Sequence, residues 1–350
     1  MNAQRPKQLE RDCQIVASDS GKALEQLRGA QLVITGGTGF VGTWLLELCC
    51  WLNDELNFGM KLIIFAPHSQ RFQNKTPHLA GRSDITWVEK DVRSVQEFPE
   101  KTNWIIHAAG SPDNRLHASD PVRTIDVITN GTRAVLLAAS RLPDLRKMLH
   151  LSSGLVAGSQ PLTLPHLSEN DYFGMDCRPV SACYVEAKRL SETLCAAYRN
   201  EHRLPVVTAR PFAFVGPYQL LDRPWAINNF IRDALLGGPI RVQGDGAAIR
   251  AYMYGADMAY WFLNILLHGR TETAYNVGGT EAVTLKELAE KVASQFTDRP
   301  KIEYGVLKGG RPQASRLVPD ISAASALGLE LKTDLNTSLR YTVEWNRSLQ

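Results

Sequence analysis

Cysteine is scarce in this chain of 350 residues, and it is not arranged as a metal site. No CxxC pair and no cysteine–histidine cluster at metal-ligand spacing occurs. We therefore expect no bound metal. We also recognise no secretory leader, so we expect free thiols and a cytoplasmic protein. The six cysteines are Cys13, Cys49, Cys50, Cys177, Cys183 and Cys195.

Long apolar runs and basic tracts are also missing. The longest apolar stretches, residues 45–52 and 261–267, are well short of the ~20 residues that span a bilayer. The net charge is only +3 and no segment concentrates lysine and arginine, which argues against a nucleic-acid partner. With 44% hydrophobic and 21% charged residues, the composition is typical of a packed globular enzyme.

Strand-length apolar runs alternate with helical patterns after the first 30 residues. This alternation predicts right-handed βαβ crossovers and an α/β fold with a Rossmann-type, doubly wound parallel sheet. We expect strands at residues 31–35, 61–66, 85–89, 103–108, 147–152 and 205–210, and long helices at 120–142 and 182–202.

Three regions are expected along the chain. Residues 1–30 form an N-terminal extension with a short helix near 22–27, and residues 31–215 form the dinucleotide-binding Rossmann domain. After Gly216 and Pro217 the alternation breaks into loops rich in proline and glycine. Residues 216–350 are therefore expected to form a smaller C-terminal substrate-binding lobe, interleaved with the end of the sheet.

The first strand leads directly into a glycine-rich turn and then a helix. Gly36 permits a tight turn, Gly39 lets the backbone approach a pyrophosphate, and Gly42 lets the helix pack closely on the strand. Phe40 and Val41 begin the helix, whose positive end suits the pyrophosphate. This arrangement predicts a dinucleotide cofactor.

The second strand does not end in the acidic residue that usually binds the ribose hydroxyls of NAD. The segment 65–71 reads FAPHSQR, without a carboxylate. Arg71 or His68 could instead meet a 2′-phosphate, or Arg71 could be a solvated loop residue. NAD is the expected cofactor, and NADP stays open.

Tyr184 and Lys188 lie four residues apart, one helical turn along the same face. An ammonium beside a phenol favours the phenolate, so we expect Lys188 to lower the pKa of Tyr184 from about 10. Tyr184 could then exchange a proton with a substrate hydroxyl. Upstream, the strand at 147–152 ends at Ser152 and Ser153, at the edge where doubly wound sheets bind ligands.

Taken together, these motifs resemble the NAD-dependent epimerase/dehydratase family of extended short-chain dehydrogenases/reductases, which modify nucleotide sugars. The resemblance covers about residues 31–345 and keeps the family order. The matching landmarks are residues 35–42, Asp91-Val92, 107–109, Gly131-Thr132, Ser152-Ser153, 184–188, 210–212, Gly216-Pro217, 244–246, 250–252, Asp257, 276–278 and Arg311-Pro312.

The resemblance implies roles for individual residues. The catalytic residues would be Ser153, Tyr184 and Lys188, with Ser153 and Lys188 also holding substrate and nicotinamide ribose respectively. The nucleotide diphosphate of the substrate would be bound by Arg250, Tyr252 and Arg311, where guanidinium groups suit phosphate. The cofactor would contact Gly36, Gly39, Phe40, Val41, Gly42, Asp91, Val92, His107, Ala108, Ala109, Tyr184, Lys188, Pro211 and Phe212.

By the same resemblance, the first chemical step is oxidation of the sugar to a keto-sugar by the nicotinamide. Dehydratases place Asp-Glu directly after the catalytic Thr, and decarboxylases keep a Glu in that segment. Here those positions are Gly154 and Leu155, which cannot transfer a proton. This favours a 4-epimerase. The alternatives are a 4,6-dehydratase, a decarboxylase or a keto-sugar reductase of the same family.

The loop that follows these positions contains three acids. Glu169, Asp171 or Asp176 in that loop could replace the missing acids, which keeps the dehydratase and decarboxylase alternatives open.

The chain departs from the usual family residues at Ala157, Ala187, Ala213 and Ile128, and these departures affect the substrate pose. In this pattern the chain resembles bacterial members of the family that act in surface-polysaccharide biosynthesis. The partner would be a nucleotide-diphosphate sugar, and the long helices would form a homodimer.

A non-enzymatic dinucleotide sensor or scaffold is the competing class, since a fold alone does not prove function. The retained Ser153, Tyr184 and Lys188 set argues against it.

Overall fold

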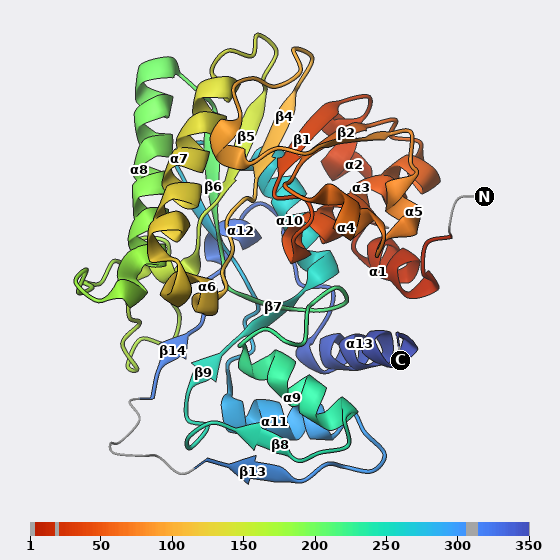
Figure 1. Cartoon of the computed structure of the whole chain (residues 1–350), viewed down its shortest axis with the longest axis vertical. Helices are drawn as coiled ribbons and strands as arrows, with labels where there is room; N and C mark the ends of the chain where they lie inside the picture. Colours follow the sequence, from red (N-terminus) through yellow and green to blue (C-terminus); the bar gives the residue numbers. More distant parts are fainter. Residues whose placement is uncertain (1–3, 18–20, 306–313, 350) are drawn as a thin grey trace.

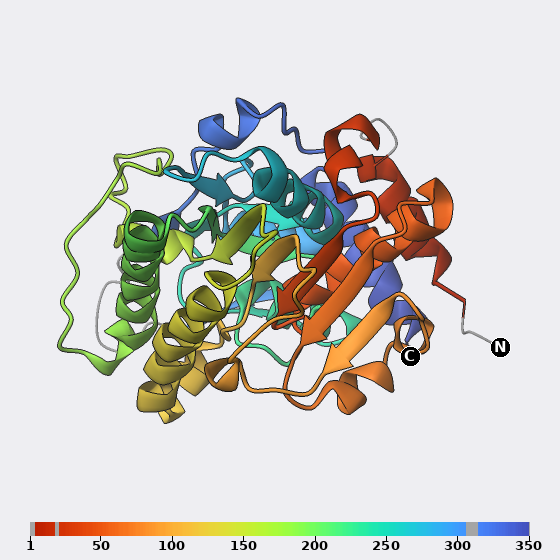
Figure 2. The same cartoon turned by 90° about the horizontal axis from the view of Figure 1, so that it is seen from above.

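The centre of the molecule is a seven-stranded parallel sheet with helices on both faces (Figures 1 and 2). The computed structural model describes residues 4–17, 21–305 and 314–349. The strand order is β11-β6-β5-β4-β1-β2-β3. The strands are β1 (Gln31–Thr35), β2 (Lys61–Phe65), β3 (Ile85–Val88), β4 (Trp104–His107), β5 (Lys147–Leu151), β6 (Val206–Pro211) and β11 (Ala274–Val277).

This arrangement confirms the doubly wound sheet expected from the sequence. All six predicted strands are present within two residues of the expected ends. The seventh strand, β11, was not predicted and pairs with β6 after the chain returns from the C-terminal lobe. Its four residues are too short a run to stand out by pattern.

The two faces of the sheet bury alternate residues of each strand. Leu32 and Ile34 pack into a core with α3 (Phe40–Leu56) and α10 (Gly255–His268). Val33 packs into a second core with α7 (Pro121–Ala139) and α8 (Cys183–His202). Because both faces are covered, the strands are apolar throughout, as expected of parallel sheets. The helices α7 and α8 lie side by side on the second face (Figure 2).

The N-terminal extension contains a helix that the sequence pattern did not reveal. α1 (Lys7–Ala17) packs on α3 and α10. Its apolar face consists of Leu9, Cys13 and Val16, one residue per turn within a polar segment. The short helix expected near 22–27 corresponds to α2 (Gly21–Leu24) and the 3₁₀ turn η1 (Glu25–Leu27).

A buried carboxylate ties this extension to the rest of the molecule. Glu47 of α3 is fully buried. It accepts a hydrogen bond from Arg5 (3.1 Å) and another from the Tyr218 hydroxyl (2.6 Å), and it contacts the His78 imidazole (2.6 Å). A buried charge of this kind is stable only when such partners are present.

The C-terminal lobe lies below the carboxyl edge of the sheet (Figure 1). Its core is formed by helices and short strands beyond residue 213. These are β7 (Ala213–Val215) paired with β10 (Tyr252–Tyr254), β8 (Ile240–Val242) with β13 (Ile302–Tyr304), and β9 (Ile249–Arg250) between β12 (Val283–Thr284) and β14 (Arg316–Leu317). The helices are α9 (Ala226–Leu235), α11 (Leu285–Ala293) and α13 (Leu335–Ser348), whereas α12 (Ser322–Ser325) packs against β11 of the central sheet.

Short elements follow the sheet strands at this edge. They are α4 (Ser69–Gln73), α5 (Pro77–Ala80), η2 (Val92–Ser94), α6 (Asn114–Ser119), η3 (Gly154–Ala157) and η4 (Val180–Ala182). Within the described residues, no helix has both the length and the apolar character needed to traverse a bilayer.

Candidate active site

The turn between β1 and α3 is packed where glycine is needed and open where a ligand would enter. Gly36 has φ +73°, and a Cβ there would lie 2.8 Å from the backbone of Ala108. A Cβ on Gly42 would strike the backbone of Gly37. At Gly39, by contrast, an added Cβ would meet only the Gly36 carbonyl oxygen, at 3.5 Å. The turn therefore presents an open side at Gly39.

The N-terminus of α3 supplies free donors at this open side. The first helical hydrogen bond runs from the Thr43 N–H to the Gly39 carbonyl. The N–H groups of Phe40, Val41 and Gly42 therefore have no partner within the helix, and no side chain caps it. Donors at a positive helix end suit a pyrophosphate. The residues present thus fit the dinucleotide expected from the sequence.

Asp91 and Val92 follow β3 at the same edge. Arg93 holds both carboxylate oxygens of Asp91 (3.0 and 2.7 Å) and also bonds Asp126 of α7. The hydrogen bond from Arg93 lowers the pKa of Asp91 to about 2, so this carboxylate is ionised. Val92 is buried against Gly131, where a Cβ would lie 2.7 Å from the Val92 side chain. A fixed acceptor thus stands at a position that the sequence analysis expected to contact the cofactor.

Glu89 reaches the edge of β2 from β3, and the sequence analysis missed it. Its Oε1 accepts hydrogen bonds from the Ser69 hydroxyl (3.0 Å) and the Gln70 N–H (3.3 Å). The available signal was that strands β2 and β3 end at one edge, so an acid after either strand reaches the same place. His68 and Arg71, the sequence-based candidates for a 2′-phosphate, are exposed beside it.

His107 at the end of β4 is buried and neutral. Its imidazole contacts the hydroxyls of Thr35 (2.7 Å) and Thr132 (3.1 Å), and burial lowers its pKa to about 3. Ala108 and Ala109 follow against the glycine turn. These residues form the floor of the site.

Tyr184, Lys188 and Ser153 come together as the sequence predicted. Tyr184 and Lys188 are buried on one face of α8, and the Tyr184 phenol is hydrogen-bonded to Ser153 after β5. The predicted direction of the tyrosine pKa was wrong. Burial raises the pKa of Tyr184 to about 12, because desolvation of the phenolate outweighs the hydrogen bond from Ser153.

The surroundings of Lys188 explain why its ammonium does not lower the pKa of Tyr184. Its Nζ donates a hydrogen bond to the Leu151 carbonyl at 2.7 Å. Burial lowers the pKa of Lys188 to about 8, so the ammonium itself is destabilised. Placing a charge in this setting is costly, and buried titratable groups of this kind are candidates for a functional site.

His117 of α6 is a second residue that the sequence analysis missed. Its ring stacks on the Tyr184 ring with centroids 4.5 Å apart and planes 14° apart. Its Nε2 contacts the Ser111 carbonyl (2.8 Å), which fixes the ring. No local motif marks this position, because the contact joins α6 to α8 across 67 residues of sequence.

Pro211 and Phe212 lie at the carboxyl end of β6, beside β11. Pro211 pairs with Val277 of β11, and Phe212 donates its N–H to the Val277 carbonyl (2.9 Å). A Cβ on Gly154 would lie 2.6 Å from the Phe212 ring, so this ring occupies the space where a side chain at 154 would stand. Leu155, the next residue, is 39% exposed and bonds the Ser153 Oγ through its N–H.

The three acids that could have replaced the missing proton donors are engaged elsewhere. Glu169 accepts a hydrogen bond from the Asn276 N–H (2.7 Å), and burial raises its pKa. Asp171 accepts from both donors of Ser168, and Asp176 pairs with Arg178. None of these contacts involves Ser153 or Tyr184.

The residues expected to bind the substrate diphosphate lie in the C-terminal lobe. Arg250 of β9 donates to the carbonyl and hydroxyl of Ser315 (3.1 and 3.0 Å), and burial lowers its pKa. Tyr252 of β10 is next but one, and burial raises its pKa. Arg311 lies outside the described residues, four positions before Ser315.

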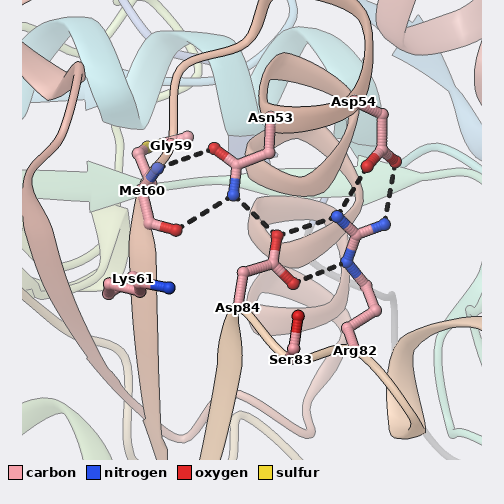
Figure 3. A pocket seen from close by; sticks show the side chains of 8 residues that line it. All are labelled: Asn53, Asp54, Gly59, Met60, Lys61, Arg82, Ser83 and Asp84. Carbon is pink, nitrogen blue, oxygen red and sulfur yellow. Dashed lines mark hydrogen bonds and ion pairs between the residues drawn. The ribbon is translucent and has the colours of Figure 1, made fainter.

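Two surface hollows flank the sheet. A groove of about 980 Å³ adjoins Asp91 and Arg93 at the carboxyl edge. The other hollow lies at the opposite edge (Figure 3), where Arg82 bonds both Asp54 and Asp84 and Asn53 also bonds Asp84. Because its charges neutralise one another, this second hollow is a structural cluster. Among the described residues no group of potential metal ligands gathers.

The chain matches the model of one protein family over residues 32–278, and that family is described as the NAD-dependent epimerase/dehydratase family. Curated proteins resemble it over most of its length. UDP-glucuronic acid decarboxylase 1 of Danio rerio is 29% identical over 329 residues, covering 93% of this chain and 74% of that protein.

Solved structures share the fold. Epimerase Mth375 of Methanothermobacter thermautotrophicus superposes with a TM-score of 0.79 at 20% identity, covering 96% of each chain. UDP-glucuronic acid 4-epimerase of Bacillus cereus, solved with UDP-glucuronic acid and NAD, gives a TM-score of 0.76 at 20% identity, covering 91% of this chain and all of that one.

Proposed function

The chain belongs to the NAD-dependent epimerase/dehydratase family, and on that premise we propose that it is a nucleotide-sugar 4-epimerase. The family consists of NAD-dependent enzymes that act on nucleotide sugars, so the cofactor is NAD and the chain is an enzyme rather than a sensor or scaffold. The finer assignment rests on the residues around Ser153.

The protein groups have distinct tasks in this reaction. Ser153 holds the reacting sugar hydroxyl, and Tyr184, hydrogen-bonded to Ser153, takes its proton. Lys188 lies buried one turn from Tyr184 and is proposed to hold the nicotinamide ribose. When bound, NAD accepts a hydride from the sugar carbon and returns it. Tyr184 would then return the proton to the sugar oxygen, and a product formed by hydride return to the opposite face would have an unchanged mass.

A single observation carries the choice of epimerase. After Ser153 the chain offers Gly154, whose side-chain space is filled by the Phe212 ring, and then Leu155. Neither residue can donate or accept a proton, and the nearby acids are engaged elsewhere. Elimination of water needs an acid and a base beside the keto-sugar, whereas epimerisation needs only Ser153, Tyr184 and Lys188.

The substrate is proposed to be a nucleotide-diphosphate sugar bound between the lobes. Arg250 and Tyr252 are proposed to hold its diphosphate, with Arg311 as a third contact. The lower pKa of half-buried Arg250 reflects a guanidinium that would gain from a phosphate partner.

A decarboxylase is the second candidate, and the curated relatives favour it. UDP-glucuronic acid decarboxylases are 28–29% identical over about nine tenths of this chain. When the carboxylate of a keto-sugar is attached to the carbon next to the new carbonyl carbon, the compound is a β-keto acid. Such a compound can lose carbon dioxide without a strong acid. The Gly154–Leu155 segment therefore weighs less against this reaction than against dehydration.

The products of turnover separate these reactions. The purified protein is denatured to identify released nucleotide by mass spectrometry, and the intact protein is incubated with UDP-, dTDP-, GDP- and CDP-sugars, including UDP-glucuronic acid. We expect retained NAD and a product of unchanged mass. A product lighter by carbon dioxide or water, or stoichiometric oxidation of NADH, would overturn the epimerase assignment. Tyr184→Phe serves as the inactive control.

We also propose a homodimer formed through α7 and α8 in a cytoplasmic protein. The outer surfaces of these helices carry exposed apolar side chains, among them Val122 (76% exposed), Ile125 and Leu137 on α7 and Leu190 on α8. Exposed apolar residues gathered on adjacent helices favour a protein–protein contact.

A further inference from the structure

The edge of β2 lacks the acid that usually binds the ribose of NAD, yet a carboxylate is present there. β2 ends at Phe65 and continues into Ala66 and Pro67, neither of which can accept a hydrogen bond through its side chain. Phe65 pairs with Val88 of β3, and the Ala66 N–H donates to the Val88 carbonyl (3.1 Å). Glu89 follows Val88, so its side chain starts at the same edge.

The glycine turn borders this place directly. The Gly36 N–H donates to the Phe65 carbonyl (2.9 Å), and Thr35 pairs with Phe65 across the sheet. A dinucleotide whose pyrophosphate lies at Gly39 and the start of α3 carries its adenosine ribose toward the end of β2. The ribose therefore passes the residues that end β2 and β3.

The Glu89 carboxylate is held over the loop that leaves β2. Its Oε1 accepts from the hydroxyl of buried Ser69 and from the Gln70 N–H. These bonds lower the pKa of Glu89, so it is ionised near neutral pH. A carboxylate has about four acceptor sites, so it can hold this position and still accept from a sugar hydroxyl.

We propose that Glu89 is the residue that selects NAD over NADP, replacing from β3 the acid that β2 lacks. A fixed carboxylate accepts hydrogen bonds from the free ribose hydroxyls and repels a 2′-phosphate. Arg71 and His68 stand in the same loop and are exposed, as Glu89 is, but of these three side chains it is the Glu89 carboxylate that is hydrogen-bonded to the loop. The carboxylate is the group that the surrounding backbone fixes in place.

Cofactor binding to the nucleotide-free protein tests this proposal without any sugar substrate. Dissociation constants for NAD and NADP are measured by calorimetry for the wild type, Glu89→Gln, Glu89→Asp and the matched control Glu55→Gln, an exposed glutamate near the end of α3. We expect Glu89→Gln to weaken NAD binding about 10-fold, the scale of one charge-assisted hydrogen bond, and to strengthen NADP binding.

The change in preference distinguishes specificity from a structural role. If Glu89 only shaped the loop, Glu89→Gln would weaken NAD and NADP equally, and that result would overturn the proposal. Unchanged constants for both cofactors would overturn it too. Arg71→Ala provides an independent test. If the wild type prefers NADP and Arg71→Ala selectively loses NADP binding, the subsite would be assigned to Arg71 instead. Glu89→Asp should retain the preference for NAD, and Glu55→Gln should change neither constant.

Discussion

At the scale of single residues, the active site depends on burying groups that would be more stable in water. Lys188 is 4% exposed, and burial lowers its pKa from 10.5 to about 8. Tyr184 is equally enclosed, and burial raises its pKa to about 12. Both shifts disfavour the charged forms that the proposed catalysis would use, so the proposed site stores unfavourable free energy that substrate and cofactor would relieve.

Replacing Lys188 by methionine should therefore separate activity from stability. The folded protein binds fewer protons at Lys188 than the unfolded chain between pH 8 and 10.5. The lysine thus costs stability in full below pH 8, and the cost disappears as the pH rises to 10.5. The cost is roughly 3 kcal/mol, from the difference between the two pKa values. Urea unfolding should show that Lys188→Met is not destabilised at pH 7, although turnover is lost.

The pH dependence provides the check on that prediction. Between pH 8 and 10.5 the unfolding free energy of the wild type should rise relative to Lys188→Met. Lys61→Met, which alters an exposed lysine, should follow the wild type. A constant difference between wild type and Lys188→Met across this range would show that Lys188 is not perturbed in the folded protein.

His117 should act on turnover through the tyrosine. Removing its ring in His117→Ala leaves Tyr184 without its stacked neighbour, and we expect kcat to fall up to about 10-fold, the scale of an aromatic pair. NAD binding should be unchanged, and His117→Phe, which keeps a flat ring, should restore most of the activity. Full activity in His117→Ala would leave the stack without a catalytic role.

At the scale of elements, the strand–turn–helix unit of β1 and α3 combines two different uses of glycine. Gly42 lies where any side chain would strike the backbone of Gly37, while Gly39 faces open space with φ −82°, which any residue can adopt. The first glycine serves the fold, and the second is proposed to leave room for the cofactor.

A matched pair of substitutions separates these uses. Gly39→Val should leave the Tm nearly unchanged but weaken NAD binding by about 100-fold or more, roughly 3 kcal/mol, because the side chain fills the approach to the α3 donors. Gly42→Val should lower stability by about 1–3 kcal/mol through overpacking. Thermal unfolding and NAD calorimetry on both variants are the measurements. Normal NAD binding by Gly39→Val would contradict the position assigned to the pyrophosphate.

At the scale of the whole molecule, the sheet and the C-terminal lobe are interleaved. The chain leaves the sheet after β6, builds part of the lobe, and returns with α10 and β11 before completing it. We therefore propose that the Rossmann domain and the lobe move together. The boundary between them near residue 215 stays a prediction. The N-terminal helix α1 packs on α3 and α10, and Arg5, just before α1, bonds the buried Glu47 of α3.

The proposed dimer is testable at this scale. Val122→Glu places a charge on the most exposed apolar position of α7, so it should shift the protein from dimer to monomer in light scattering coupled to size exclusion. Val180→Glu, an exposed apolar position outside both helices, is the control. A wild type that is monomeric at micromolar concentration would contradict the dimer directly.

The sequence determined those features that depend on local spacing. The six predicted strands, the glycine turn at 36–42 and the Tyr184–Lys188 pair are all contained in short segments, because periodicity and turn chemistry act over a few residues. The sequence patterns did not predict α1 and β11, since α1 is a polar helix with a narrow apolar face and β11 is a four-residue strand.

Tertiary structure alone decided contacts between segments far apart in the chain. Glu89 reaches the loop after β2, His117 stacks on Tyr184, and the Phe212 ring fills the space beside Gly154. It also reversed the expected direction of the Tyr184 pKa. Sequence spacing shows that a lysine is near a tyrosine, but only the packed structure sets how much water either group loses, and desolvation is the larger effect in this site.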